Sequence, residues 1–598
     1  MKIKMKGKQS FCEQSVRTET MRKVCIMMLL FFFFPFSLYI NFSTFVGKQT
    51  KQTTMKRFLT TMTIIAAATS MATAQGFDNL PSPIEDVNKV VDNTPDSIAK
   101  ALMSRPAPGS TRKGSNPVLF LIGNSTMRNG TRGDGSNGQW GWGYYASQYF
   151  NGNRISVENQ ALGGMSTRTF YRKLWPDVRQ ALRPGDWVII SIGHNDNGPF
   201  DSGRARAVLP GTGSDSLAVT IKETGDHEVV YTYGGYLRRY IAECRAAGAH
   251  PVLMSLTPRD AFDETTHKIV RKPHTGWAAI VAGEEGVPFV DLNEISGQKL
   301  DSYSPWKEKY QFFGDHIHTS YWGAEMNARS AAEGLMASRN PDLKPLQQMM
   351  TGVALPVWPV KREQGKPVVW ITGDSTVKNR DRDKDGMWGW GAFAGTVFDE
   401  KKCTPYNAAM AGRSTRSYIR EGRWEKVYNA LQPGDFVLIQ FGHNDISPIT
   451  DKKERGVIPT AADTCHVYKM EQDGRFEVVY SFGWYLKKMI DDTREKGATP
   501  ILVSLTTRNE WPGGKVERRN DSYGRWYREV VKETGVEFVD AHNLIADYLD
   551  KHYKSKADAA EYFNHDHTHN SLKGAKNNAK MVARGIREIG SKLASLLK

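Results

Sequence analysis

Short apolar runs alternate with amphipathic stretches along most of this chain. In the first half the apolar runs are Val118–Ile122, Trp187–Ile192, Val252–Leu256 and Pro288–Val290. Between them, apolar residues recur at the three- and four-residue spacing of a helix, as in Tyr233–Ala247 and Tyr321–Met336. Uniformly apolar strands that alternate with helices are typical of a parallel sheet with helices on both faces.

The second half repeats this pattern. Its apolar runs are Val368–Ile371, Phe436–Phe441, Ile501–Leu505 and Glu537–Val539, and its helical stretches lie near Trp484–Glu495 and Asn570–Ile589. The sequence therefore predicts two α/β domains.

Four short motifs also occur twice, in the same order. They are GNST at Gly123–Thr126 and GDST at Gly373–Thr376; NQALGGMST at Asn159–Thr167 and NAAMAGRST at Asn407–Thr415; GHND at Gly193–Asp196 and Gly442–Asp445; and DHIH at Asp315–His318 and DHTH at Asp566–His569. Since order and spacing are both kept, the chain contains two copies of one domain.

The predicted domains span residues 117–339 and 367–598, and the Pro-rich segment 340–366 is a firm, partly extended linker. Residues 75–116 form a polar leader. Both copies contain a loop of about 35 residues between the third strand and the next helix, in which Val208–Ser216 of the first copy corresponds loosely to Val457–Thr464 of the second. Loops of that length are usually functional, and we expect this one to lie over the carboxyl ends of the strands, where parallel sheets bind ligands.

The amino-terminal part accounts for much of the net charge of +16, because residues 1–74 hold eleven Lys/Arg and only two Glu. The remaining +7 suits a polyanionic substrate and equally an ordinary solvated surface. Residues 55–74 combine a basic start, an apolar centre and small residues before Gln75, which is typical of a secretory signal peptide. We interpret residues 1–54 as an over-long start, with a membrane anchor as the alternative, and expect a secreted or periplasmic mature protein.

The cysteines of the predicted mature chain, Cys244, Cys403 and Cys465, are too few for a disulfide framework. Cys244 has the spacing of a buried helix position, and a Cys403–Cys465 bridge is conceivable. Zinc binding at His565–His569 is disfavoured because the first copy lacks the first histidine and no second ligand cluster exists. We therefore expect neither a metal nor a cofactor.

The repeated motifs contain the groups of a serine esterase. Ser125 and Ser375 each follow an apolar strand, where the hydroxyl can attack a carbonyl if a base removes its proton. Asp315 with His318, and Asp566 with His569, supply a base and a carboxylate that orients it at the predicted start of a helix. The oxyanion donors that repeat are the serine N–H, the N–H of the glycine and the amide of the asparagine, which gives Gly164, Asn195, Gly412 and Asn444.

Together these motifs resemble the SGNH hydrolases, or GDSL-type esterases, and within them the rhamnogalacturonan acetylesterases of carbohydrate esterase family 12. The resemblance rests on GDST, AGRSTRS at Ala411–Ser417, GHND and DxxH. It implies a flavodoxin-like three-layer α/β/α fold with a five-stranded parallel sheet, and the same nucleophiles, bases and oxyanion residues. The first copy departs from this pattern, because Asn124 replaces the Asp of GDST and Met165 replaces Arg413, so the second copy matches it more closely.

Other repeated residues have two interpretations each. The tryptophans of QWGWG (Gln139–Gly143) and MWGWG (Met387–Gly391) either stack on sugars or pack against the sheet, and the core position is favoured. Four arginines could hold a uronate carboxylate or pair locally on the protein. They are Arg168, Arg259, Arg416 and Arg508.

The leading hypothesis is a secreted serine esterase that removes acetyl groups from an acetylated acidic polysaccharide, above all pectic rhamnogalacturonan. The alternatives are acetylated xylan, another glycan or simple lipid esters as substrate, or a carbohydrate-binding protein in which one or both copies are inert. Scattered basic residues and the absence of a recognised motif argue against nucleic acid, and we expect no membrane association of the mature protein.

Overall fold

The computed structural model describes residues 105–128, 135–271, 273–378 and 386–598. The predicted extension at 1–54, the signal peptide at 55–74 and the leader up to residue 104 lie outside these described residues. Within the described ranges, no helix has both the length and the apolar character needed to cross a bilayer.

The first copy contains a five-stranded sheet in which every neighbouring pair is parallel. The strand order is β2-β1-β3-β6-β7. The strands are β1 (Val118–Gly123), β2 (Ser156–Asn159), β3 (Trp187–Ser191), β6 (His250–Met254) and β7 (Phe289–Val290). This order reverses direction beside β1, and open parallel sheets bind ligands at the carboxyl ends of the strands at such a point.

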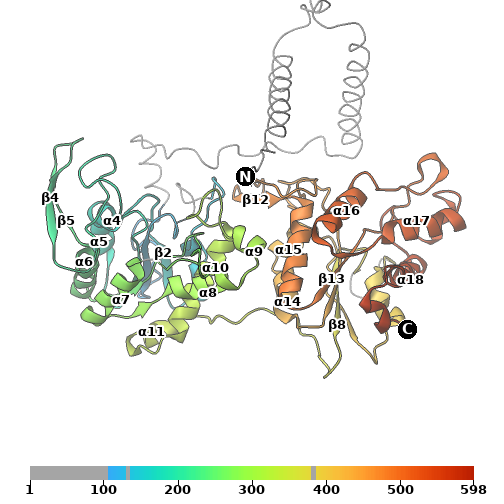
Figure 1. Cartoon of the computed structure of the whole chain (residues 1–598), viewed down its shortest axis with the longest axis horizontal. Coiled ribbons are helices and arrows are strands. Elements are labelled where there is room, and N and C mark those ends of the chain that lie inside the picture. Colours follow the sequence, from blue (N-terminus) through green and yellow to red (C-terminus); the bar gives the residue numbers. More distant parts are fainter. Residues whose placement is uncertain (1–104, 129–134, 272, 379–385) are drawn as a thin grey trace, which may run out of the picture. The chain divides into compact units, whose positions relative to one another are not determined.

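Helices pack on both faces of this sheet (Figure 1). Alternate residues of β1 point to opposite sides, so Phe120 belongs to one apolar cluster and Leu121 to another. The first cluster includes residues of α4 (Thr167–Lys173), α5 (Trp175–Ala181), α6 (Tyr233–Ala246) and α7 (Pro273–Glu285). The second includes residues of η1 (Trp142–Tyr144), η2 (Ala146–Tyr149), α8 (Leu292–Ser302) and α10 (Tyr321–Ala337); the short α9 (Pro305–Lys309) precedes α10.

The second copy has the same sheet. Its order β14-β13-β10-β8-β9, read from the other edge, matches that of the first copy. The strands are β8 (Val368–Gly373), β9 (Thr404–Asn407), β10 (Phe436–Gln440), β13 (Thr499–Val503) and β14 (Glu537–Val539), and all pairs are parallel. The prediction of two α/β domains with five-stranded parallel sheets is confirmed.

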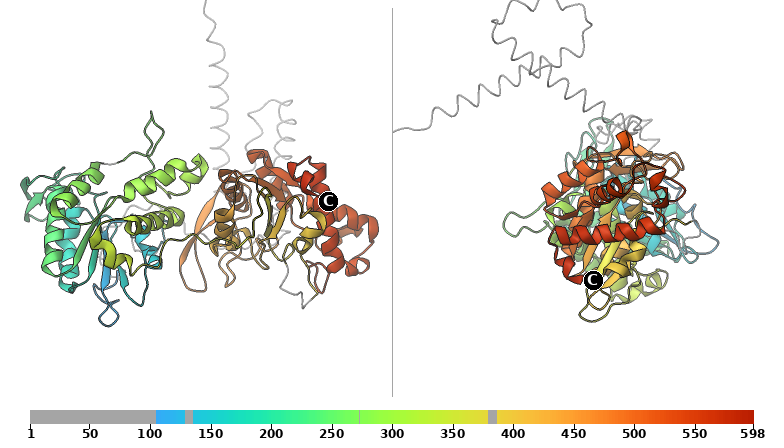
Figure 2. Two further views of the ribbon diagram at one scale, coloured as in Figure 1. Left: turned by 90° about the horizontal axis from the view of Figure 1, so that it is seen from below. Right: turned by 90° about the vertical axis from the view of Figure 1, so that its right-hand side faces the viewer.

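The helices of the second copy also fall on two faces of their sheet (Figures 1 and 2). One apolar cluster joins the sheet to η4 (Trp390–Phe393), α12 (Ala394–Val397), α17 (Ala541–His552), η6 (Asp558–Glu561), α18 (Leu572–Glu588) and η7 (Lys592–Leu596). The remaining helices are α13 (Thr415–Arg420), α14 (Arg423–Ala430), α15 (Phe482–Glu495), η5 (Pro512–Gly514) and α16 (Tyr523–Thr534).

The long loop predicted between the third strand and the next helix contains an antiparallel hairpin in each copy. The hairpins are β4 (Ser216–Thr220) with β5 (His227–Tyr231), and β11 (Cys465–Lys469) with β12 (Phe476–Tyr480). These strands were not predicted from the sequence because their apolar runs are short; in β4 only Leu217, Ala218 and Val219 are apolar, and the strand is almost wholly exposed.

The segments before the two sheets are anchored in the same way. Arg112 forms an ion pair with the buried Asp186 at 2.6 Å, and Arg362 forms the corresponding pair with Asp435 at 2.6 Å. The repeated structure therefore begins upstream of the predicted domain starts at residues 117 and 367. Within the predicted linker, η3 (Pro341–Leu343) and α11 (Lys344–Gln347) are helical, and residues 351–367 form no regular element.

Three smaller predictions have clear outcomes. Cys244 is fully buried on α6, as its spacing indicated. All three described cysteines are free, so the Cys403–Cys465 bridge considered above is not formed. Trp142 and Trp390 are buried in the core, which confirms the packing interpretation for these tryptophans.

Candidate active site

Each candidate nucleophile lies in a tight turn directly after an interior strand of its sheet, the one next to the edge strand. Ser125 follows β1, and Ser375 follows β8. In the first copy, the Asn124 side-chain oxygen accepts hydrogen bonds from the main-chain N–H and the hydroxyl of Thr126, at 3.0 and 2.9 Å. These bonds fix the turn and leave the serine hydroxyl at the carboxyl end of the strand.

The candidate base and its carboxylate lie beside this serine in both copies. Ser125 Oγ is 2.8 Å from His318 Nε2, and His318 Nδ1 is 2.7 Å from Asp315 Oδ2. In the second copy Ser375 Oγ is 2.8 Å from His569 Nε2. His569 Nδ1 is in turn 2.6 Å from Asp566 Oδ2. Serine, imidazole and carboxylate thus form one hydrogen-bonded series, the arrangement that activates a serine for acyl transfer.

The loop that carries the aspartate and histidine differs from the sequence expectation in one respect. Asp315 and His318 lie in a turn, and helix α10 begins only at Tyr321, after the N-cap Ser320. Asp315 Oδ1 accepts the main-chain N–H groups of Ile317 and His318, at 2.7 and 2.8 Å. The aspartate therefore folds its own turn with one oxygen and orients the imidazole with the other.

These hydrogen bonds keep the carboxylate ionised. Partial burial raises the pKa of Asp315, but the bonds from the His318 ring and from the main-chain N–H groups outweigh it and lower the pKa to about 2. Partial burial likewise opposes the bonds to Asp566, and its pKa is also lowered. An ionised carboxylate at this position stabilises the imidazolium that forms when the serine loses its proton.

The glycine of the predicted oxyanion site lies in a loop attached to the serine strand. The Leu162 N–H donates to Gly123 O at 3.2 Å, next to the serine turn. Gly164 has a φ of +77° and Gly412 a φ of +78°, a conformation that favours glycine. Within the described residues, no acceptor takes the main-chain N–H of Ser125 or Gly164, so both donors can face a substrate oxygen.

The four residues of GHND have separate structural tasks. His194 Nε2 is 3.2 Å from Thr257 Oγ1, and His443 makes the same contact with Thr506 at 3.1 Å. The Asn195 side chain turns toward the glycine loop, where its Nδ2 donates to Met165 O at 3.1 Å. The structure thus ties the predicted oxyanion asparagine to the residue that follows the predicted oxyanion glycine.

The aspartate of GHND is a supporting residue that the sequence analysis missed. The buried Asp196 accepts the N–H and the hydroxyl of Thr167, the first residue of α4, at 2.8 and 2.5 Å. Asp445 makes the corresponding bonds with Thr415 at 3.0 and 2.5 Å. The sequence did contain a signal for this contact, since both GHND and STR occur in each copy. The contact itself could not be predicted, because the two segments meet only in the folded chain.

Two of the four candidate arginines are engaged inside the protein. Arg168 and Arg416 are fully buried, and their guanidinium groups bind Glu228 at 2.6 Å and Glu477 at 2.8 Å on the hairpins. Each also donates to two loop carbonyl groups. Of the two interpretations above, the local pairing is the one that the structure supports for these residues, because no edge of the guanidinium remains for a substrate.

The other two arginines lie beside the catalytic loops. The residue after Arg259 donates its N–H to His316 O at 2.9 Å, and the residue after Arg508 donates to His567 O at 2.7 Å. Burial lowers the pKa of Arg508, and the neighbouring Arg519 lowers it further. The Nε of both Arg259 and Arg508 is buried without a protein partner in the described part of the chain.

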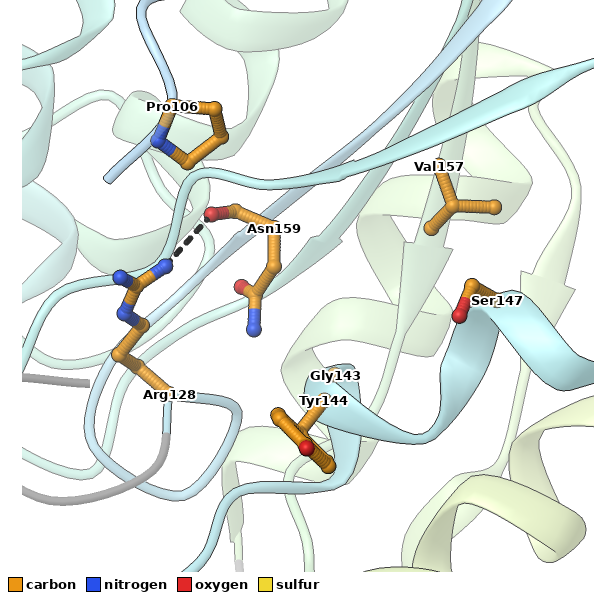
Figure 3. Close-up of a pocket in the computed structure, with 7 residues that line it drawn as sticks. All are labelled: Pro106, Arg128, Gly143, Tyr144, Ser147, Val157 and Asn159. Carbon is orange, nitrogen blue, oxygen red and sulfur yellow. Dashed lines mark hydrogen bonds between the residues drawn. The ribbon is translucent and has the colours of Figure 1, made fainter. Parts of the chain in front are cut away.

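A cavity of about 290 Å³ lies next to the serine turn of the first copy (Figure 3). It is lined by Pro106, Arg128, Gly143, Tyr144, Ser147, Val157 and Asn159. Arg128 donates to Asn159 O at 3.1 Å, and the Tyr144 ring is half exposed. At the positions of Arg128 and Tyr144 the second copy has Lys378 and Ala392, so the two copies differ in residues that line this cavity in the first.

Both copies match one known protein family. Residues 121–326 and 371–576 each match the GDSL-like Lipase/Acylhydrolase family. These matches cover more than half of the chain, which therefore belongs to this family and contains two tandem copies of its domain.

The chain is also similar to rhamnogalacturonan acetylesterases and to an acetylxylan esterase. The probable rhamnogalacturonan acetylesterase YesY of Bacillus subtilis strain 168 is 30% identical over 236 residues, which are 38% of this chain and 97% of that protein. Rhamnogalacturonan acetylesterase RhgT of the same strain is 30% identical over 243 residues, which are 38% of this chain and 92% of that protein. Among solved structures, a catalytic mutant of the acetylxylan esterase Axe2 from Geobacillus stearothermophilus has 21% identity and a TM-score of 0.27, over 37% of this chain and 95% of that chain.

Proposed function

We propose that this protein is a secreted serine esterase that removes acetyl groups from an acetylated acidic polysaccharide, with pectic rhamnogalacturonan as the leading substrate. The observation that carries the proposal is the serine–histidine–aspartate series in both copies, with 2.8 Å between serine Oγ and histidine Nε2 in each. The similarity to rhamnogalacturonan acetylesterases supports the choice of polymer.

The reaction follows from the geometry of each site. The histidine Nε2 takes the serine proton as Oγ attacks the acetyl carbonyl carbon, and the carbonyl oxygen becomes an oxyanion held by the serine and glycine N–H groups and the asparagine amide. The histidine then gives its proton to the departing sugar hydroxyl, which leaves an acetyl-serine. Water attacks this ester by the same route and releases acetate. The chain's own groups perform every proton transfer.

The acidic nature of the proposed substrate rests on Arg259 and Arg508. Both guanidinium groups adjoin the catalytic loop, and their buried Nε donors have no protein acceptor among the described residues. A carboxylate of a uronic acid would supply that acceptor in a two-pronged contact. A neutral acetylated glycan such as xylan offers no such group.

The test is acetate release from a panel of acetylated polymers. We expect acetylated rhamnogalacturonan to be deacetylated faster than acetylated xylan at equal acetyl concentration. The variant with both Ser125→Ala and Ser375→Ala should release no acetate above background, while each single variant retains activity. Undiminished release by the double variant would exclude this mechanism, and faster release from xylan would replace the proposed polymer.

A further inference from the structure

An arginine contacts the oxyanion asparagine in both copies, although neither arginine belongs to a repeated motif. Arg206 Nη1 donates to Asn195 Oδ1 at 3.1 Å, and Arg455 Nη1 donates to Asn444 Oδ1 at 2.7 Å. Each arginine follows its asparagine by eleven residues, in the loop that precedes the hairpin. Both copies have therefore kept this contact outside the repeated motifs.

The two partners of the asparagine side chain determine which way its amide points. A guanidinium has only donors, so the atom that faces Arg455 must be the amide oxygen. A main-chain carbonyl only accepts, so the atom that faces Arg413 O, at 3.1 Å, must be the amide nitrogen. One hydrogen of the Asn444 amide is used in this bond, and the other remains for the substrate oxyanion.

The backbone adopts an unusual conformation to bring the arginine to this position. The residue before it is left-handed in both copies, with a φ of +41° at Ala205 and +48° at Glu454. Non-glycine residues rarely adopt this conformation, and it persists where the surrounding structure enforces it. Its recurrence at the same position in two divergent copies indicates that the conformation of this loop has a functional role.

The buried arginine of the STR motif holds this loop in place. Arg168 Nη1 donates to Ala207 O at 3.1 Å, and Arg416 Nη1 donates to Gly456 O at 2.9 Å. Each carbonyl belongs to the residue directly after the arginine on the asparagine. Arg168 and Arg416, which form the buried ion pairs described above, thus hold the loop in place through these carbonyl groups. Arg206 and Arg455 extend from the same loop to the oxyanion site.

The arginine of the second copy also adjoins the oxyanion glycine. A β-carbon on Gly412 would lie 3.8 Å from Arg455 Nη1, and one on Gly164 would lie 3.2 Å from Arg204 Nη1. A positive charge therefore lies close to the glycine and the asparagine of the predicted oxyanion site in the second copy, where the tetrahedral intermediate develops its negative charge.

We propose that Arg206 and Arg455 are positioning residues of the esterase reaction, which fix the amide orientation of Asn195 and Asn444 so that an N–H faces the oxyanion. The inference requires only acyl hydrolysis, the chemistry of the family, and it holds whichever polymer is the substrate. The inference predicts that loss of the arginine lowers kcat, because the asparagine amide is no longer oriented, and that it leaves the affinity for the substrate unchanged.

The experiment uses the full chain with Ser125→Ala, so that only the second site is active. Arg455→Met, Asn444→Ala and the double variant are compared on a small neutral acetyl ester and on acetylated rhamnogalacturonan, with kcat and KM measured for each. Lys453→Met is the matched control, since Lys453 is exposed in the same loop and the change removes the same charge.

Loss of one oxyanion donor typically costs ~10²–10³ in kcat. We therefore expect Asn444→Ala to fall in this range and Arg455→Met to lower kcat about 10- to 100-fold on both substrates with little change in KM. The double variant should be no slower than Asn444→Ala, because the arginine works through that side chain. Lys453→Met should match the parent.

Three results would overturn the inference: an unchanged kcat of Arg455→Met on the neutral ester, an increase in KM confined to the acidic polymer, or losses that multiply in the double variant. Arg455→Lys, which keeps the charge and one donor, guards against misfolding and should lose less activity than Arg455→Met. A parent that hydrolyses the neutral ester and not the polymer would count against the proposed substrate alone.

Discussion

Asn124 and Asp374 occupy the same position in the two copies and form the same turn. The side-chain oxygen of Asp374 accepts the N–H and the hydroxyl of Thr376 at 2.9 and 2.8 Å, as Asn124 does with Thr126. The replacement therefore preserves the geometry that presents the serine. What differs is a buried ionisable group, since burial raises the pKa of Asp374.

This difference predicts a pH effect that separates the copies. Burial raises the pKa of Asp445 to about 7, with Asp374 adding to the shift, whereas the pKa of Asp196 beside Asn124 is raised to about 6. A raised pKa means that the folded state binds a proton which the unfolded state has already lost, so the free energy of unfolding falls as pH rises from about 4 to about 7. Asp374→Asn should lower the Asp445 pKa and weaken this pH dependence.

Denaturant unfolding of the Asp374→Asn variant and the parent at several pH values between 4 and 8 would measure the effect. Asn124→Asp is the reciprocal change and should strengthen the pH dependence through Asp196. Equal slopes for the parent and Asp374→Asn would mean that Asp374 does not act on Asp445.

The orienting carboxylate gives a second prediction. In the Ser125→Ala background, Asp566→Asn should lower kcat by ~10⁴, because an amide favours the wrong tautomer of the imidazole while keeping the turn. The measurement is kcat on a neutral acetyl ester. Organophosphonate labelling of Ser375 checks that the nucleophile is still present and accessible. A decrease of less than about tenfold would show that another group orients His569.

The sequence was sufficient to predict the interior strands and the candidate serine, histidine and aspartate that the fold brings together. Strands such as β1 and β10 are buried on both sides and read as continuous apolar runs, and these candidate residues lie in motifs that occur twice. The edge strands β2 and β9 were missed because each has only four residues, is partly exposed and lacks a continuous apolar run.

The supporting contacts of the site could not be predicted for a different reason. Arg168 pairs with Glu228, and Arg455 with Asn444, and each pair is joined only by the fold of a loop between them. The arginine of STR therefore allowed two interpretations in the sequence. The left-handed conformation of Ala205 and Glu454 could not be predicted from the residue type, because neither is a glycine.

The role of Arg508 in recognising an acidic substrate is a third prediction. Arg508→Gln should raise KM for acetylated rhamnogalacturonan about tenfold or more, since a hydrogen bond to a charged group contributes about 1.5–3 kcal/mol. KM for a neutral acetyl ester should stay unchanged. Arg525→Gln is the matched control, because Arg525 is exposed on α16. An equal increase in KM on both substrates would show that Arg508 shapes the site without binding a carboxylate.

The buried ion pair of the second copy gives a fourth prediction, which separates support of the loop from substrate binding. Arg416→Met removes the buried guanidinium from Glu477, which keeps an ion pair with Arg475 at 2.9 Å, so the free energy of unfolding should fall by about 3 kcal/mol, the lower end of the cost of breaking a buried pair. Because Arg416 also holds the carbonyl of Gly456, next to Arg455, kcat of the second site should fall as well. Denaturant unfolding and ester hydrolysis in the Ser125→Ala background measure both effects. An Arg416→Met variant of unchanged stability, with an increase in KM for the polymer alone, would return this arginine to the substrate-binding role.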